Sequence, residues 1–223
     1  MKEPFSLSFE CSEEVLELFQ QKVGDLKMIM AHYSSAIMEV ETKLKVLNEQ
    51  FCVQQSYNPI ETIKTRLKSP ESIIEKLRRK HLPLEIKSLE EGIYDIAGVR
   101  VICPFVKDIY MLADCLLGQD DVTLLHKKDY ILEPKESGYR SLHLIIETPI
   151  YLQQEKKNMK VEIQLRTIAM DFWASLEHRM QYKKNIDPSL AEMLMLELKE
   201  CAWENAKLDE KMERIMERLE GRG

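Results

Sequence analysis

The sequence predicts an α+β protein in which helical segments at both ends enclose a centre of mixed strands and helices. Apolar residues recur at helical spacing over residues 12–51 and again over 167–220, with a break at residues 187–189. Between these segments they alternate with polar residues, as they do in strands. The 223 residues, of which 44% are hydrophobic, suffice for one large domain with a core.

The first helical segment, residues 12–51, predicts one or two long amphipathic helices, and the turn residues 57–59 end it. A second helix is expected over residues 70–81, because Ser69 is suited to cap its first turn and Pro70 to occupy its first position. Its predicted apolar side consists of Ile73, Ile74 and Leu77, and its other side carries Ser72, Lys76 and Arg79.

The centre of the chain predicts strands. Residues 98–103 are expected to form a buried strand that Pro104 ends, and a short helix is expected over 108–117. Residues 140–147 and 160–166 alternate between apolar and polar side chains, so each predicts a strand with one buried face. A surface strand would alternate in the same way, so the period alone assigns no function.

Two helices are expected after the last strand. The first covers residues 167–184, and its predicted apolar stripe consists of Ile168, Phe172, Leu176 and Met180. The second is a highly charged amphipathic helix that begins near residue 190 and runs to Gly221. The sequence contains no internal repeat and no low-complexity tract.

The net charge of −6 is unevenly distributed. A net acidic chain is not suited to coat nucleic acid, because binding to many phosphates needs a surplus of Lys and Arg. Residues 64–80, however, hold seven basic side chains and two acidic ones. This local surplus indicates a site for a compact anion, and a solvated helix face is the alternative.

The five cysteines are scattered and are never spaced as Cys-x-x-Cys. The sequence therefore indicates neither a disulfide framework nor a zinc site. No apolar run is long enough for a signal peptide or a membrane span, so no membrane association is expected. We expect a cytoplasmic protein.

Cationic and hydroxyl side chains surround the start of the helix expected over residues 70–81. Arg66 and Lys68 precede it, and its polar face carries Ser72, Lys76 and Arg79. A helix N-terminus offers unpaired backbone N–H groups and a partial positive charge, which suit a phosphate. The arrangement indicates a polyphosphate site, although the chain lacks the glycine-rich loop of P-loop enzymes. A basic helix that only faces solvent is the alternative.

Two carboxylates are candidates for a metal site. Asp95 lies just before the strand expected over 98–103, and Glu162 lies on the polar face of the strand expected over 160–166. If that face lines a cleft, the pair could hold Mg²⁺, which prefers oxygen ligands and bridges substrate phosphates. Two simpler interpretations stay open: Asp95 as a turn or capping residue, and Glu162 as an exposed strand residue.

Tyr139 and His143 follow a Ser-Gly turn at 137–138. An aromatic ring and an imidazole four residues apart on a strand could stack on a base or flank it, and a packing pair is the alternative. The helix expected next carries Asp171, Ala174 and Glu177 opposite its apolar stripe. A small residue leaves room for a ring, and carboxylates can accept from a guanine edge. A solvated helix face is again the alternative.

Four motifs occur in order along the chain. They are Arg66-x-Lys68-x-x-x-Ser72, Tyr94-Asp95-Ile96-Ala97-Gly98-Val99-Arg100, Gly138-Tyr139-Arg140-Ser141-Leu142-His143, and residues 161–167 together with 171–178. In this order they resemble the synthetase domain of RelA/SpoT-type (p)ppGpp synthetases over about residues 57–184. The whole length resembles the stand-alone small alarmone synthetases.

The resemblance implies a mixed β-sheet flanked by helices, related to nucleotidyltransferases. It implies transfer of pyrophosphate from ATP to the 3′-hydroxyl of GTP or GDP, which yields pppGpp or ppGpp and AMP. For ATP it implies Arg66 and Arg100 at the adenine, and Lys68, Ser72, Lys76 and Arg79 at the phosphates. It assigns Mg²⁺ to Asp95 and Glu162. Glu162 would also accept the 3′-hydroxyl proton.

The resemblance also implies the acceptor site. Its residues would be Tyr139 at the guanine, Lys135 and His143 at the phosphates, and Gln164, Asp171, Ala174 and Glu177 at the border of the pocket. Some relatives have Asn where this chain has Asp171.

We expect a helical region at 1–56, the synthetase core at 57–186 and a C-terminal helix at 187–223, in one compact domain. The amphipathic ends exceed what a monomeric core needs, and the resemblance suggests a homotetramer. The chain lacks the His-Asp pair of the hydrolase domain of long relatives, so we expect synthesis without hydrolysis.

Two alternative functions stay open. One is a regulator that binds an alarmone or single-stranded RNA without turnover, and both of these ligands are also candidate regulators of a synthetase. The other is a relative that pyrophosphorylates a different acceptor, such as ATP or a tRNA end.

Overall fold

The computed structural model describes residues 13–54, 57–181, 187–219 and 221. The strands are β1 (Thr62–Leu67), β2 (Ala97–Cys103), β3 (Thr123–Asp129), β4 (Leu142–Tyr151) and β5 (Lys156–Thr167). The helices are α1 (Glu13–Gln54), α2 (Pro70–Arg79), α3 (Ile86–Gly92), α4 (Val106–Leu117), α5 (Ile168–Gln181) and α6 (Pro188–Leu219).

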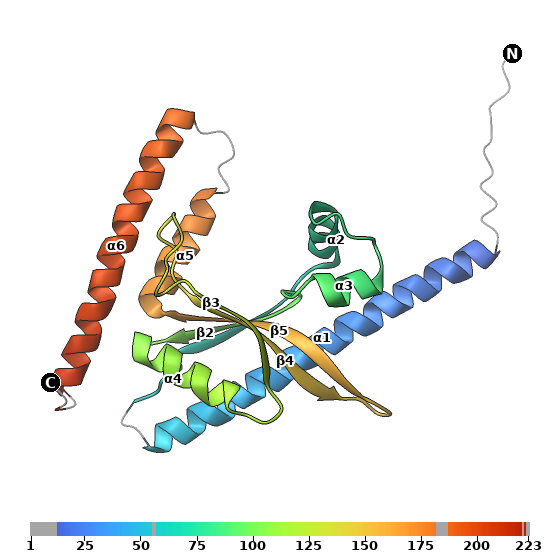
Figure 1. Cartoon of the computed structure of the whole chain (residues 1–223), viewed down its shortest axis with the longest axis horizontal. Coiled ribbons are helices and arrows are strands. Elements are labelled where there is room, and N and C mark those ends of the chain that lie inside the picture. Colours follow the sequence, from blue (N-terminus) through green and yellow to red (C-terminus); the bar gives the residue numbers. More distant parts are fainter. Residues whose placement is uncertain (1–12, 55–56, 182–186, 220, 222–223) are drawn as a thin grey trace, which may run out of the picture.

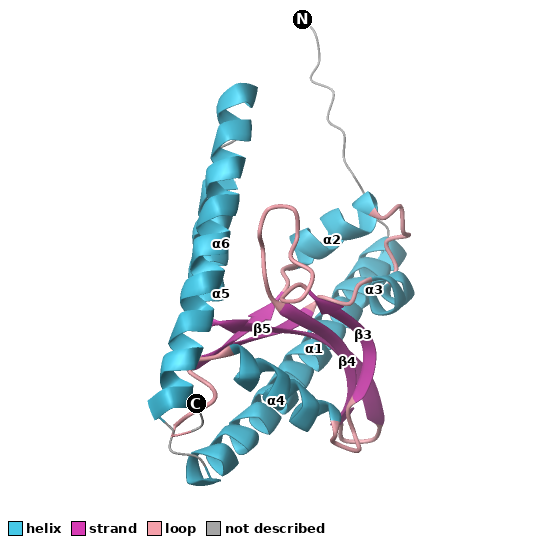
Figure 2. Ribbon diagram, turned by 60° about the vertical axis from the view of Figure 1, so that its left-hand side comes forward, coloured by secondary structure: helices cyan, strands magenta, loops and turns pink. Residues whose placement is uncertain are grey.

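One five-stranded sheet organises the fold. Its strand order is β1-β2-β5-β4-β3, with β2 and β5 parallel and the other neighbours antiparallel. Helices α1 and α4 lie against one face, while α2 and α5 rise at opposite ends of the other (Figures 1 and 2). The prediction of an α+β protein with a mixed sheet flanked by helices is therefore confirmed.

Alternation along β4 and β5 separates a buried face from a polar one. Val161, Ile163 and Leu165 are buried, whereas Glu162 and Gln164 between them are only half-buried. The apolar face packs against α1 and α4 because burying aliphatic side chains is the main stabilising term, worth about 1.5–3 kcal/mol for each fully buried one. The polar face of the same strands is left to form a site.

The predicted helices are present with small differences. The segment expected as one or two helices is the single helix α1, which continues through Gly24. Ser69 caps α2 as expected, because its Oγ accepts a hydrogen bond from the backbone N–H of Ser72 at 3.3 Å. Ile73 and Leu77 are buried on α2, but Ile74, expected on the same side, is 37% exposed.

The apolar stripe predicted on α5 is not part of the core. The expected apolar stripe faces outward: its members are Ile168, Phe172, Leu176 and Met180, and their exposure runs from 36% to 63%. The opposite side is buried instead, including Asp171, Trp173 and Ala174. Helical spacing identifies a stripe, but it does not say whether the stripe meets the chain's own core or another surface.

The C-terminal helix α6 is attached along α5. The indole Nε1 of Trp173 donates to the carbonyl of Leu198 at 3.0 Å, and Asn205 Nδ2 donates to the carbonyl of Ala169 at 2.6 Å. Among the described residues, no helix combines the length and the apolar character that crossing a membrane requires.

Candidate active site

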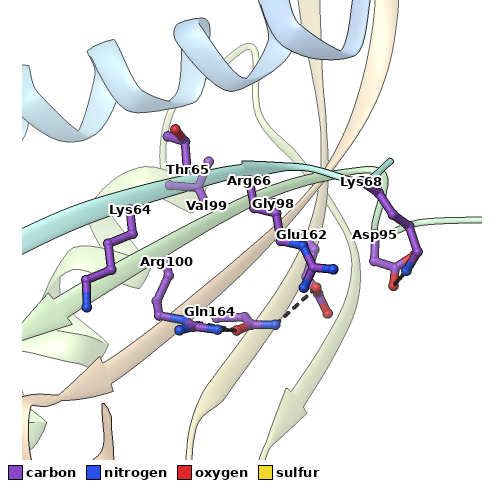
Figure 3. A pocket seen from close by; sticks show the side chains of 10 residues that line it. All are labelled: Lys64, Thr65, Arg66, Lys68, Asp95, Gly98, Val99, Arg100, Glu162 and Gln164. Carbon is purple, nitrogen blue, oxygen red and sulfur yellow. Dashed lines mark hydrogen bonds and ion pairs between the residues drawn. The ribbon is translucent and has the colours of Figure 1, made fainter. Parts of the chain in front are cut away.

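Two cavities open on the polar face of the sheet, and they meet at two carboxylates. The first cavity, of about 390 Å³, is lined by Lys64, Thr65, Arg66, Lys68, Asp95, Gly98, Val99, Arg100, Glu162 and Gln164 (Figure 3). The second, of about 500 Å³, is lined by Lys76, Lys80, Tyr94, Asp95, His126, Lys128, Tyr130, Lys135, His143, Ile145 and Glu162. Asp95 and Glu162 border both cavities, so a molecule in each could reach the same point.

Strand pairing produces the first cavity. Gly98 on β2 stands between Arg66 on β1 and Glu162 on β5 in the register of the sheet. Because Gly98 has no side chain, the space between these two residues stays open. In Figure 3 the side chain of Arg66 extends toward Glu162, and that of Arg100, from the adjacent strand, extends toward Gln164. The predicted adenine-binding pair therefore lines one cavity.

Asp95 is held by two of the predicted phosphate ligands. Its Oδ2 lies 2.6 Å from Lys76 Nζ and 2.9 Å from Lys68 Nζ. Burial raises the pKa of Asp95, but the hydrogen bonds and charges of Lys76 and Lys68 outweigh it and lower the pKa below its ordinary value. Asp95 is therefore an anion at neutral pH.

Glu162 is also ionised. Its Oε2 accepts a hydrogen bond from Gln164 Nε2 at 3.1 Å, and His143 Nδ1 lies 3.4 Å from its Oε1. Burial raises the pKa of Glu162, and the nearby carboxylate of Asp95 acts in the same direction. His143 and Gln164 outweigh both and leave this pKa lowered. An ionised carboxylate is the form that can take up a proton or hold a metal ion.

The donor set at the junction of the cavities fits Mg²⁺. The carboxylates of Asp95 and Glu162 share the two cavities, and Asp95 Oδ1 is buried without a hydrogen-bond partner. Within the described ranges, no group of three or more His, Cys, Asp or Glu side chains could hold a metal on its own. Mg²⁺ is usually held by one or two carboxylates together with substrate phosphates, so two are enough.

A tight turn carries the predicted base-stacking residue. Lys135 and Gly138 are bonded through their backbones at 2.8 Å, and Gly138 has a φ of +89°, a conformation that favours glycine. Tyr139 then bonds His143 through its hydroxyl at 2.8 Å, and Lys135 Nζ lies 4.7 Å from the ring centroid of Tyr139. The structure thus brings together Lys135, Tyr139 and His143.

Arg166 was absent from the predicted site. It is 5% exposed, and its guanidinium contacts three predicted acceptor residues: Tyr139 Oη at 2.5 Å, Gln164 Oε1 at 3.3 Å and Asp171 Oδ1 at 3.3 Å. It also lies 5.0 Å from the ring centroid of Tyr139. The strict alternation of its strand could have found it, because Arg166 is two and four positions after Gln164 and Glu162.

Asp171 is surrounded by cations. Lys64 Nζ lies 3.0 Å from its Oδ2, and Arg166 Nη1 and Arg100 Nη1 lie 3.3 and 3.5 Å from its Oδ1. Ala174 is buried in a small cluster with Trp173 and Ala202, against which Tyr139 packs. Arg166 thus connects Asp171 to Tyr139, and Ala174 belongs to the cluster against which Tyr139 packs.

Six predicted residues lie outside the linings of the two cavities. Tyr139, Asp171 and Ala174, whose contacts are given above, are three of them, and the other three are Ser72, Arg79 and Glu177. Ser72 belongs to the first turn of α2 and accepts a hydrogen bond from Ser69 Oγ at 3.1 Å. Arg79 is exposed near the end of the same helix, and Glu177 is half-buried on α5. The structure does not bring these three to the junction of Asp95 and Glu162.

The fold and the paired carboxylates agree with the RelA/SpoT class of proteins. The model of that family, described as the region found in RelA / SpoT proteins, matches residues 65–187, more than half of the chain. The chain belongs to the RelA/SpoT family.

Particular relatives cover nearly the whole chain. The chain is 45% identical over 204 residues to the GTP pyrophosphokinase YwaC of Bacillus subtilis, which is 88% of this chain and 96% of that protein. It superposes with a TM-score of 0.77 on the crystal structure of small alarmone synthetase 2 from Bacillus subtilis, at 44% identity, over 87% of this chain and 99% of that one.

Small alarmone synthetase 1 of the same organism, in a structure bound to its product pppGpp, gives a TM-score of 0.77 at 36% identity. That match covers 88% of this chain and 99% of that one.

Proposed function

We propose that the chain is a GTP pyrophosphokinase that transfers pyrophosphate from ATP to the 3′-hydroxyl of GTP or GDP. The products are pppGpp or ppGpp and AMP, and no hydrolysis of the product is expected. One observation carries the proposal: two cavities rich in cationic side chains meet at Asp95 and Glu162. A reaction between two nucleotides needs such a meeting point for their phosphate and hydroxyl groups.

ATP occupies the first cavity in this proposal. Arg66 and Arg100 hold the adenine between their guanidinium planes, a contact that lysine could not replace. The residues assigned to its phosphates are Lys68, Ser72, Lys76 and Arg79. Asp95 and Glu162 hold Mg²⁺, which neutralises developing charge on the transferred phosphates when it is bound. Lys68 lines the first cavity and Lys76 the second, and their common contact with Asp95 at the junction supports a role at the phosphates. The roles of Ser72 and Arg79 rest on the resemblance.

The acceptor occupies the second cavity. Its guanine stacks on Tyr139, and its phosphates meet Lys135 and His143. The carboxylate of Glu162 accepts the proton of the 3′-hydroxyl while that oxygen bonds to the β-phosphorus of ATP. The bond between the β-phosphorus and the oxygen that bridges it to the α-phosphorus breaks, and AMP leaves with that oxygen. The border of the acceptor pocket is assigned to Gln164, Asp171, Ala174 and Glu177.

Competition between acceptors tests this function. Purified protein is incubated with labelled ATP, Mg²⁺ and an equal mixture of GTP, GDP, ATP and tRNA, and the products are separated by chromatography. We expect pyrophosphorylated guanosine nucleotides. Label in tRNA or in an adenosine product would support the relative with a different acceptor. Binding of an alarmone or RNA without any turnover would support the regulator.

The turn before β4 gives a prediction about the acceptor. A Cβ at Gly138 would lie far inside van der Waals contact with Ala202 Cβ on α6, at a φ that L-residues rarely adopt. Gly138→Ala should therefore displace Tyr139 and raise the KM for GDP about tenfold or more, since such strain costs about 1–3 kcal/mol. Steady-state kinetics with GDP as the varied substrate measure this KM.

A second substitution separates the two causes of the expected effect, which are the clash with Ala202 and the backbone strain at position 138. Adding Ala202→Gly removes the clash and should restore part of the GDP affinity. Gly24→Ala on α1, where no atom lies within 4 Å of a new Cβ, is the matched control and should leave this KM unchanged. An unaltered KM in Gly138→Ala would contradict the placement of Tyr139.

We propose that the chain works as a homotetramer in the cytoplasm. Its helical ends, 1–56 and 187–223, would build the contacts around the synthetase core at 57–186. Support for such contacts comes from exposed apolar side chains of α6, among them Leu196 and Trp203. The outward apolar stripe of α5, in which Phe172 is 63% exposed, would extend the contact onto the core itself. The free cysteines among the described residues, of which Cys52 and Cys201 are exposed, are consistent with a reducing compartment.

Phe172→Glu should dissociate this assembly. A carboxylate in an apolar interface is costly to bury, so the particle mass should fall below four times the 26.2 kDa of one chain. Light scattering measures the mass. Tyr151→Glu, at a similarly exposed position of the β4–β5 hairpin, is the control and should keep the wild-type mass. An unchanged mass in Phe172→Glu would remove the α5 stripe from the interface.

A further inference from the structure

In the free protein the negative charge of Asp95 is balanced by two lysine side chains. Lys76 and Lys68 both direct their ammonium groups at the same oxygen, Oδ2, at 2.6 and 2.9 Å (Figure 3 shows Lys68). Their side chains are only 19% and 15% exposed, and that of Asp95 is 23% exposed. Solvent screening of these pairs is therefore weaker than at the protein surface.

This arrangement disfavours the binding of a metal ion at Asp95. A divalent ion at Asp95 and Glu162 would approach two ammonium groups that already contact the carboxylate it needs. The remaining oxygen, Asp95 Oδ1, is buried and has no hydrogen-bond partner. One free oxygen beside two positive charges is a poor site for a metal ion alone.

A polyphosphate chain changes this balance. The same two lysines are the phosphate ligands in the proposed function, on which the inference rests. Phosphate oxygens offer the ammonium groups a new anionic partner, and each lysine that turns to them frees Asp95. A lysine side chain can change its partner in this way with little backbone movement, because its ammonium group lies at the end of a flexible chain of four single bonds beyond Cβ.

We propose that Lys68 and Lys76 are internal counter-ions that keep the metal site of the free protein closed until the triphosphate of ATP draws them away from Asp95. The metal ion and ATP then bind with positive coupling, so that the binding of each raises the affinity for the other. The free protein consequently holds its carboxylates without a divalent ion, and the catalytic site is completed only when the donor nucleotide is present.

A titration with Mn²⁺ and no nucleotide tests the proposal. Free Mn²⁺ is followed by electron paramagnetic resonance, so no turnover is needed. The double variant Lys68→Gln/Lys76→Gln keeps an N–H donor near Asp95 and removes both charges. We expect it to bind Mn²⁺ at least about tenfold more tightly than wild type, because removing adjacent like charge favours cation binding. Each single variant should give an intermediate gain.

Two controls assign the gain to this contact. Lys64→Gln removes the same charge from the first cavity, but Lys64 pairs with Asp171, so Mn²⁺ affinity should stay at the wild-type level. Adding Asp95→Asn to the double variant should abolish the gain. Circular dichroism confirms that each variant is folded.

The proposal is overturned if the double variant binds Mn²⁺ no more tightly than wild type, or if the gain persists with Asp95→Asn. Since the readout needs neither ATP nor GTP, it is independent of the proposed function. A tighter Mn²⁺ site in a protein without pyrophosphoryl transfer would keep the counter-ion role and remove the function.

Discussion

Glu162→Gln is expected to lower the rate of pyrophosphoryl transfer by about 10²–10⁴, the usual contribution of a general base. Glutamine cannot take the proton of the 3′-hydroxyl, and it is a weaker ligand for Mg²⁺ than a carboxylate. Binding of ATP depends on Arg66, Arg100 and Lys68 in our account, so it should change little. Single-turnover rates and the affinity for a non-hydrolysable ATP analogue measure the two quantities separately.

Glu147→Gln is the matched control for this variant. Glu147 lies on β4, outside the linings of both cavities, and its Oε1 accepts a hydrogen bond from Asn158 at 3.2 Å. The same chemical change there should leave the transfer rate near that of wild type. Near wild-type turnover by Glu162→Gln would remove Glu162 from its role as base.

Arg166→Lys is expected to raise the KM for GDP about 10–100-fold. Lysine keeps the charge but cannot bond Tyr139, Gln164 and Asp171 together with one planar group. A hydrogen bond to a charged group contributes about 1.5–3 kcal/mol, so the loss of one of them explains this range. Arg166 is a positioning residue in this account, so the affinity for an ATP analogue should fall less than the affinity for GDP.

The ratio of the two affinities distinguishes positioning from a loss of stability. If the role of Arg166 were purely structural, Arg166→Lys would lower the melting temperature and weaken the binding of both nucleotides equally. That result would contradict our assignment. Arg179→Lys, in the last turn of α5 where the side chain is exposed, should leave both affinities unchanged.

The central strands and the main helices could be predicted from the sequence because their signals are local. β2 and β5 are apolar on at least one face, and α4 buries the side that its spacing predicts. The edge strands β1 and β3 were missed. Most of their residues are exposed, so an apolar alternation that could reveal them is absent. The short helix α3 was missed as well; of its seven residues only Leu89 is buried.

The site was predictable as a set of motifs but not as a geometry. Strand position and the resemblance both indicated Asp95 and Glu162, whereas their common position at two cavities depends on the parallel pairing of β2 with β5. The contact between Lys64 and Asp171 joins residues 107 positions apart, and no local pattern carries that information. Spacing identified the apolar stripe of α5 but left open which way it faces.

Asp171 shows why a motif alone is insufficient. Its position in the motif suggested a contact with the guanine edge, but three cations surround its carboxylate. Its oxygens are already engaged with Lys64, Arg100 and Arg166. Its contribution to base recognition therefore stays a prediction, while its contacts with Arg100 and Arg166 link the walls of both nucleotide sites.

The fate of separately labelled phosphates of ATP tests the central claim most directly. The protein is incubated with GDP, Mg²⁺ and ATP labelled either at the α- or at the γ-phosphate. Pyrophosphoryl transfer predicts the γ label in a guanosine product and the α label in AMP, in equal amounts. Formation of ADP with transfer of a single phosphate, or the absence of any guanosine product from folded protein, would contradict the account.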